Sequence, residues 1–120
     1  MSDLLNKDAI LNARDVKGEE VEVPEWNGTV FIRVMDGSCR DHFEQTCQER
    51  YSETGEKKYD GMKALLLVLT LSDRNGVMLF DEADIDALNA KSGAVIDRLF
   101  QKALQVNGIG KKAMEEIAGN

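Results

Sequence analysis

The longest apolar stretch of the chain runs from Lys63 to Leu71 and contains five leucines. Leucine and alanine favour a helix over a strand, so this pattern predicts a buried helix. Asp60 is the expected N-cap, and the turn residues Asp73–Gly76 should end the segment. The stretch is too short to cross a bilayer, which needs about 20 apolar residues. We therefore expect this helix at the centre of the core, covered by the other segments.

The sequence before residue 20 carries apolar residues at helical spacing. Ser2 or Asp3 is suited to cap a short helix in this region. Such a helix would place its larger apolar groups on one side, and its apolar members would be Leu4, Leu5, Ala9, Ile10 and Ala13.

Two later segments alternate apolar and polar residues, as strands do. The alternation covers residues 21–23 and returns over residues 29–35. Pro24 should end the first strand because it has no N–H for a ladder. The pair Asn27-Gly28 is a strong turn signal, so the two strands are expected to form an antiparallel hairpin. A lone hairpin is only marginally stable, and one of its faces must pack on a helix.

Helix caps mark two segments after the hairpin. Asp36 can start a helix that runs through about Tyr51, and residues 52–60 are expected to form an exposed polar loop. Asp81 should open another helix, with Asp84 at its third position. The first helix is expected to bury a stripe that consists of Cys39, Phe43, Cys47 and Tyr51. The second is expected to begin with a hydrophobic staple between Phe80 and Ile85.

The clearest amphipathic segment begins at Ser92 and stops at Asn107-Gly108. On a helical wheel its apolar residues fill one half, and its charged and amide residues fill the other. Residues 111–118 then predict a last short helix. The residues expected to face inward are Val95, Ile96, Leu99, Phe100, Ala103, Leu104 and Val106 in the long helix, and Ala113, Met114 and Ile117 in the short one.

Together these elements predict an α+β fold. It is expected to be mainly α-helical, with four to six helices and one small antiparallel β-hairpin. The 120 residues leave room for one core, and no shift in composition marks a second, so we expect residues 1–120 to form a single domain.

The charge of the chain argues against nucleic acid as a partner. It has 15 basic and 22 acidic residues, a net charge of −7, which repels phosphate backbones. The first five residues lack the basic and apolar regions of a signal peptide. We therefore expect a cytoplasmic protein with neither nucleic acid nor membrane as a partner.

Three residues are candidates for a zinc site or a catalytic thiol, namely Cys39, His42 and Cys47. On one helix they spread over a wide arc, and the chain has no third cysteine or second histidine to complete a zinc site. The two cysteines lie about 12 Å apart along a helix axis, too far for a disulfide. Burial of both cysteines in the helix stripe explains them better. The sequence contains no catalytic motif, so we expect no enzyme, metal or cofactor.

One segment of the sequence does favour binding to nucleic acid. Residues 106–117 resemble a helix-hairpin-helix, whose Gly-hydrophobic-Gly turn presents backbone amides to a DNA phosphate. Lys111 and Lys112 would add charge, but Glu115 and Glu116 lie in the same helix. A glycine cap between two antiparallel helices is the favoured interpretation. A DNA-binding accessory protein that uses Asn107–Ile117 is the alternative function.

The expected hairpin turn holds the only proline and the only tryptophan, Pro24 and Trp26. A tryptophan at such a tip can fold back onto a helix, or it can bind a partner. If Trp26 is exposed, it is the best single candidate for an interface hot spot, since tryptophan and arginine dominate interface energetics.

Several motifs in the order found here resemble the tail assembly chaperones of long-tailed (siphovirus-type) bacteriophages and prophages. No single motif is specific, but their order and spacing together are. The motifs are Val21–Arg33, then Arg40–Glu44, then Leu71–Gly76, then Leu79-Phe80 with Asp84 and Leu88, and finally Ala103-Leu104 with Asn107-Gly108. Asn27 replaces the glycine that usually follows the tryptophan in this family, and it still permits the turn.

This resemblance implies a non-catalytic chaperone that coats the tape measure protein and helps the tail tube protein polymerise around it. Proteins of this kind self-associate, act in the host cytoplasm, and are absent from the mature virion. Many are also made in a longer form by ribosomal frameshifting, which would reach the tail tube protein. The resemblance further implies that the junction of the hairpin with the next helix, or a partner-binding surface, uses Pro24, Trp26, Arg33, Arg40 and Phe43.

Overall fold

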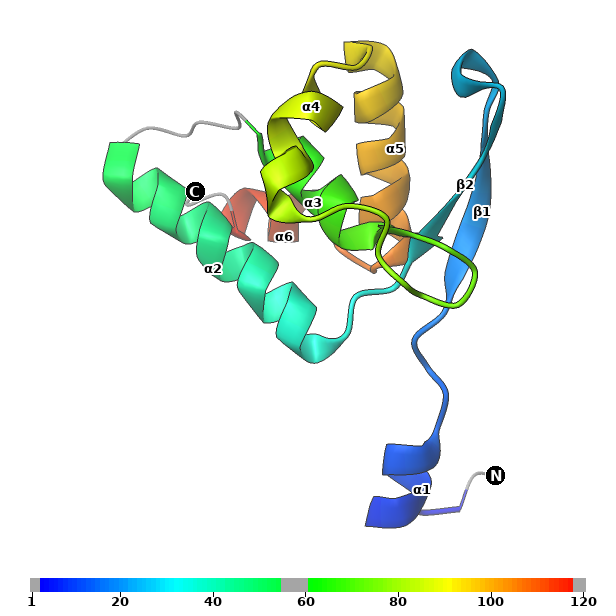
Figure 1. The fold of residues 1–120 in the computed structure, drawn as a ribbon. Helices are drawn as coiled ribbons and strands as arrows, with labels where there is room; N and C mark the ends of the chain where they lie inside the picture. Colours follow the sequence, from blue (N-terminus) through cyan, green and yellow to red (C-terminus); the bar gives the residue numbers. More distant parts are fainter. Residues whose placement is uncertain (1–2, 55–60, 118–120) are drawn as a thin grey trace.

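The predicted central helix is confirmed. A computed structural model describes residues 3–54 and 61–117. In it, helix α3 (Met62–Thr70) lies among the other elements (Figure 1), and all of its residues except Lys63 are buried. The predicted cap is wrong, because Gly61 occupies the N-cap position with a positive φ of 78° and no side-chain hydrogen bond. Asp60 itself lies outside the described residues.

The predicted hairpin is confirmed, and a third strand extends it. Strands β1 (Gly18–Val23) and β2 (Gly28–Arg33) pair antiparallel, from Gly18 opposite Arg33 to Val23 opposite Gly28. Strand β3 (Leu71–Ser72) pairs with the other edge of β2, so the sheet order is β1-β2-β3. The two residues of β3 directly follow α3 and were not predicted from the sequence.

The turn of the hairpin is shaped by Pro24 and Asn27. Pro24 opens a single 3-10 turn, η1 (Pro24–Trp26), and Asn27 follows in the left-handed conformation with φ 55°. At the other end of β1, a Cβ on Gly18 would lie 2.3 Å from the carbonyl oxygen of Ile32. Only glycine allows the two strands to approach so closely there.

Helix α2 (Gly37–Thr54) begins at the predicted cap. The Asp36 carboxylate accepts a hydrogen bond of 2.8 Å from the Cys39 N–H. The helix continues to Thr54, so the loop expected from residue 52 does not begin there, and residues 55–60 lie outside the described part. Of the predicted stripe, Phe43 and Cys47 are buried and Cys39 is half-buried.

The predicted helix start at Asp81 is confirmed, and Asp84 completes a capping box there. The Asp81 carboxylate accepts a hydrogen bond from the Ala83 N–H, and the Asp84 carboxylate accepts one from the Asp81 N–H. A 3-10 turn, η2 (Glu82–Asp84), leads from this box into α4 (Ile85–Asn89).

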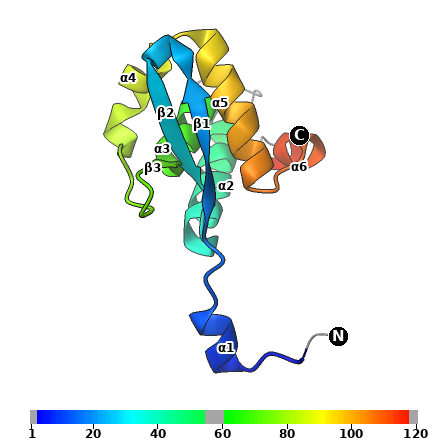
Figure 2. The same ribbon diagram turned by 90° about the vertical axis from the view of Figure 1, so that its right-hand side faces the viewer.

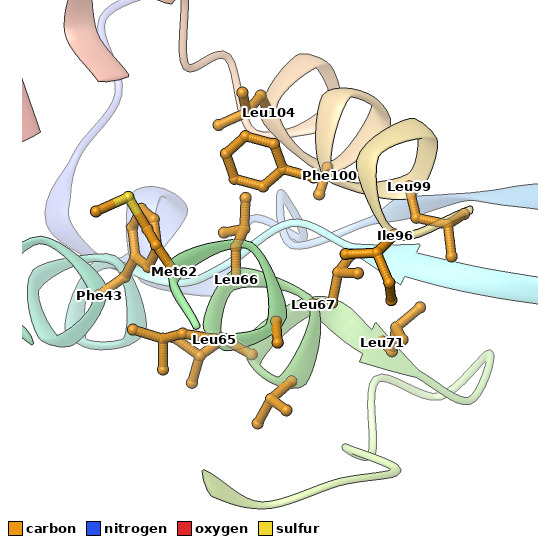
Figure 3. Packing of buried hydrophobic residues seen from close by; sticks show 14 of the residues in the cluster. Phe43, Met62, Leu65, Leu66, Leu67, Leu71, Ile96, Leu99, Phe100 and Leu104 are labelled. Atoms are coloured by element: carbon orange, nitrogen blue, oxygen red, sulfur yellow. The ribbon is translucent and has the colours of Figure 1, made fainter. Parts of the chain in front are cut away.

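The two C-terminal helices cover another side of α3. Helix α5 (Gly93–Val106) packs on it closely, and α6 (Lys111–Ile117) follows after Gly108, whose φ of 66° ends α5 as predicted. Figure 3 shows α5 side chains directed toward α3. The buried residues of the two helices are Val95, Ile96, Leu99, Phe100, Ala103 and Leu104, and Met114 and Ile117.

The first helix stands away from this body. Helix α1 (Lys7–Asn12) begins at Asn6, whose side chain accepts a hydrogen bond from the Ala9 N–H, so the predicted start at residue 2 or 3 is wrong. It buries no residue, and Figures 1 and 2 both show it beyond the open end of the hairpin. The predicted α+β, mainly helical fold is confirmed. None of the described helices is long and apolar enough to cross a membrane.

Candidate functional site

The five predicted site residues lie at opposite ends of the hairpin. Pro24 and Trp26 form its tip, whereas Arg33 ends β2 and is followed closely by Arg40 and Phe43 on α2. The structure therefore builds two separate regions. We call the exit of the hairpin the junction and define it by Arg33, Arg40, Phe43 and Asn107, which the following contacts connect.

Arg33 ties the hairpin to two helices. Its Nε donates a 3.0 Å hydrogen bond to the carbonyl oxygen of Leu69, near the end of α3. Its Nη2 lies 3.5 Å from the Sγ of Cys39, in the first turn of α2. Because Arg33 is only half-buried, its charge keeps contact with water while its donors fix the angle between strand and helices.

Asn107 is the buried centre of the junction. Its Oδ1 accepts a 2.7 Å hydrogen bond from the Met35 N–H, and its Nδ2 donates to the carbonyl oxygens of Ala103 at 2.9 Å and Arg33 at 3.3 Å. Arg40 adds a 3.2 Å bond from Nη1 to the Asn107 carbonyl oxygen. This role of Asn107 was not predicted, because nothing local in the sequence signals a partner 72 positions away.

Phe43 supplies the apolar part of the junction. Its side chain has no exposed surface, and it belongs to the cluster that includes Met62 and Leu66. Figure 3 shows it directed from α2 toward α3, on the side of Met62. Phe43 therefore anchors α2 on the central helix.

A shallow groove lies at the hairpin tip. It has a volume of about 400 Å³, and we call it the tip groove, defined by Trp26, Phe80, Ala87, Leu88 and Lys91. Trp26 is half-buried and packs against the core, so it folds back onto the body and still presents part of its ring. The contributions of Phe80 and α4 were not predicted from the sequence.

A two-pronged ion pair holds the tip against α5. The Arg98 guanidinium donates two hydrogen bonds of 2.8 Å to the two carboxylate oxygens of Glu25. The hydrogen bonds from Arg98, assisted by a backbone hydrogen bond of Glu25, lower the pKa of this carboxyl from 4.5 to about 2. Glu25 is thus stabilised as an anion in the folded state.

This ion pair predicts a dependence of stability on acid. A lowered folded-state pKa adds stability above about pH 4.5, and the gain is lost as the pH falls toward about 2. We therefore expect Glu25→Gln to lower the urea midpoint at neutral pH, with the difference from the wild type vanishing near pH 2. Urea titrations across this range check it, with Glu22→Gln on the preceding strand β1 as control. A difference that stays constant with pH would contradict the assignment.

The residues considered for metal or thiol chemistry do not converge. Cys47 is buried, and burial raises the pKa of the half-buried Cys39 thiol. His42 is exposed, and its Nε2 lies 2.8 Å from Glu82. Among residues 3–54 and 61–117, no group of three His, Cys, Asp or Glu is placed to hold a metal ion.

The segment that resembles a helix-hairpin-helix takes part in internal packing. Ile109 is buried, and its N–H donates a 2.8 Å hydrogen bond to the Leu104 carbonyl oxygen. Lys111 and Lys112 are exposed, as is Glu116. These contacts match a turn that joins α5 and α6, and DNA binding by Asn107–Ile117 stays a prediction.

Comparison with known proteins identifies the family. The sequence model of the phage tail assembly chaperones matches residues 6–119. The solved structure of the tail assembly chaperone of bacteriophage HK97 is similar, with a TM-score of 0.56 and 20% identity over 82% of this chain and 90% of that chain, which shows a shared fold. No curated protein sequence matches the chain. The resemblance found in the sequence is thus confirmed, and the chain belongs to the phage tail assembly chaperone family.

Proposed function

We propose that this chaperone binds the tape measure protein of its phage and promotes assembly of the tail tube around it. Membership of the tail assembly chaperone family carries this proposal. The family and the fold imply a non-catalytic protein that acts on phage tail proteins. A tape measure protein must stay soluble until the tube surrounds it, and a protein that covers it meets this need.

The surface of the molecule supports binding rather than catalysis. Large apolar side chains are exposed before β1 and again in the loop between β3 and η2, where Val77, Met78 and Leu79 lie. Exposed apolar residues gathered in this way are typical of surfaces that contact other proteins. The ionisable groups with shifted pKa values serve ion pairs or sit beside the junction, and do not form a reactive cluster.

Three further features belong to the same proposal. The chaperone acts in the host cytoplasm and does not remain in the mature virion. Copies of it associate with one another. A longer form, made by ribosomal frameshifting, contacts the tail tube protein and so links the tape measure to the growing tube.

Co-expression with the cognate tape measure protein tests the proposal. We expect the chaperone to raise the soluble yield of that protein, measured in the cleared lysate, whereas an unrelated acidic protein of similar size leaves it unchanged. No rise with the cognate partner would contradict the proposal.

One double variant separates this function from the DNA-binding alternative. Lys111→Glu combined with Lys112→Glu should retain the effect on soluble yield. If the alternative holds, the wild type retards duplex DNA in a gel at low salt and this variant does not, because phosphate contacts depend on these charges. Absence of retardation by the wild type would exclude the alternative.

A further inference from the structure

A cavity at the open end of the hairpin is lined by three basic residues. It lies between the start of β1 and the loop that follows β3 (Figure 1), and its volume is about 300 Å³. Among residues 3–54 and 61–117, no aspartate or glutamate lines it, although the chain has a net charge of −7. We call it the basic cavity, defined by Lys17, Arg33 and Arg74 together with Val16, Phe31 and Asn75.

The charge of Arg33 is not neutralised within the described part of the chain. Its Nε donates to the carbonyl oxygen of Leu69, and its Nη2 lies beside the Sγ of Cys39. The carbonyl end of a helix carries only a partial negative charge, and burial keeps the thiol protonated by raising its pKa. The Nη1 of Arg33 has no partner among the described residues, so this guanidinium retains donors for an anion.

Arg74 is held by a carboxylate that lies outside the basic cavity. Its Nη2 donates a hydrogen bond to the Oε1 of Glu20, and both side chains are exposed. Exposed ion pairs of this kind are weak, because water competes with both partners. Glu20 and an anion in the cavity would therefore compete for the same guanidinium.

The hairpin wall of the cavity is fixed by the β1–β2 ladder. The Lys17 carbonyl oxygen accepts a 2.6 Å hydrogen bond from the Val34 N–H, which extends the ladder beyond Gly18. A Cβ on Gly18 would lie 2.7 Å from the Cε1 of Phe31, so the ring lies over this glycine. Phe31 thus forms a fixed apolar wall.

The loop wall is fixed by a turn around Asp73. The Asp73 carboxylate accepts hydrogen bonds of 2.8 Å from the Asn75 N–H and 3.0 Å from the Val77 N–H. Gly76 completes the turn with a φ of 84°, and its N–H donates a 3.0 Å hydrogen bond to the Asp73 carbonyl oxygen. Both walls are therefore formed before any ligand arrives.

We infer that the basic cavity binds an organic oxyanion, namely a carboxylate or phosphate group attached to an apolar or aromatic group. A guanidinium presents its donors in a planar fork that matches the oxygens of either anion. The apolar part of the ligand would pack against Phe31 and Val16, which an inorganic ion cannot do. A ligand bound in this way bridges the hairpin and the loop after β3. The site does not depend on the proposed binding to the tape measure protein.

Titration of the full chain with small anions tests the inference. The probes are phenylacetate, phenyl phosphate, inorganic phosphate and the neutral 2-phenylethanol, at constant pH and ionic strength. In amide spectra recorded by nuclear magnetic resonance, the two aromatic anions should shift the Lys17, Phe31 and Gly76 signals and saturate. At least one should bind about threefold or more tightly than inorganic phosphate, because the ring adds buried apolar surface. The tighter of the two aromatic anions identifies the anionic group, and 2-phenylethanol should give no saturable shift.

Two opposite substitutions make the test specific to the cavity. Lys17→Gln combined with Arg74→Gln should weaken binding by about threefold or more, as expected for the loss of partly exposed charge contacts. Glu20→Gln should instead strengthen it, because Arg74 is released to the ligand. A disturbed fold would weaken binding, so a gain cannot come from that source.

Each substitution has a control with the same change of charge. Lys111→Gln combined with Lys112→Gln removes two exposed cations from α6 and should leave the affinity unchanged. Glu22→Gln removes an exposed carboxylate from β1 without releasing a cation, so it should strengthen binding less than Glu20→Gln does.

Four results would overturn the inference. They are the absence of a saturable shift with both aromatic anions, shifts centred on α6 instead of the cavity, equal binding by the wild type and the Lys17–Arg74 double variant, and equal effects of Glu20→Gln and Glu22→Gln.

Discussion

Replacement of Phe43 by alanine is expected to lower the free energy of unfolding by about 3–5 kcal/mol. The ring is fully buried between α2 and α3, and its removal leaves a cavity that the central leucines cannot fill without moving. A domain of this size is stable by about 5–15 kcal/mol in total, so the loss is a large fraction. Urea unfolding followed by circular dichroism measures it.

The matched control for this substitution is Phe31→Ala. Phe31 lies on β2 and is only half-buried, so the same change of residue removes less buried surface. We expect a loss well below that at Phe43. Equal losses at the two positions would show that Phe43 does not anchor α2 as described.

Replacement of Asn107 by alanine is expected to cost about 1–3 kcal/mol for each buried group that it leaves without a partner. The Met35 N–H loses its 2.7 Å acceptor, and the Arg33 carbonyl oxygen loses one donor. Both groups lie at the point where β2 leads toward α2. We therefore expect a lower urea midpoint together with faster hydrogen exchange of the Met35 amide, measured by nuclear magnetic resonance.

The amide exchange distinguishes this effect from a general loss of stability. Asn89→Ala, at the exposed end of α4, serves as the control and should change stability by less than about 0.5 kcal/mol. If Asn107→Ala lowers stability while the Met35 amide keeps its protection relative to neighbouring core amides, the hydrogen bond to Met35 is not the source of the loss.

The sequence predicted the elements whose signals are local. The leucine run of α3, the half-apolar wheel of α5 and the helix start at Asp81 each depend on residues within a few positions of one another. The hairpin belongs to the same class, because Pro24 and Asn27 mark its turn directly. These elements are sufficient to predict the α+β fold.

Features that depend on distant pairing could not be predicted in this way. Strand β3 has two residues, too few for an alternating pattern, and exists because β2 offers a free edge beside the end of α3. Asn107 is a common helix stop, and only the fold places Met35 within reach of its side chain. The tip groove likewise combines Trp26 with α4, two segments that no local pattern connects.

The first helix shows a different limit of the sequence. The apolar spacing indicated a helix near the N-terminus, and α1 forms there, but Leu4 and Leu5 lie before its start. Periodicity tells which residues share a face, but it does not tell which surface that face contacts. In this chain the helix buries no residue against its own body.

The hydrogen bond between Met35 and Asn107 sets an order of events on the ribosome. The Met35 N–H at the end of β2 can form this bond only after Asn107 has been synthesised, 72 positions later. Contacts between such distant positions slow folding, because a long loop must close first. We expect that the nascent chain keeps its leucine-rich centre incompletely covered until α5 has emerged. During its own synthesis, this tail assembly chaperone thus exposes apolar surface that the completed fold buries.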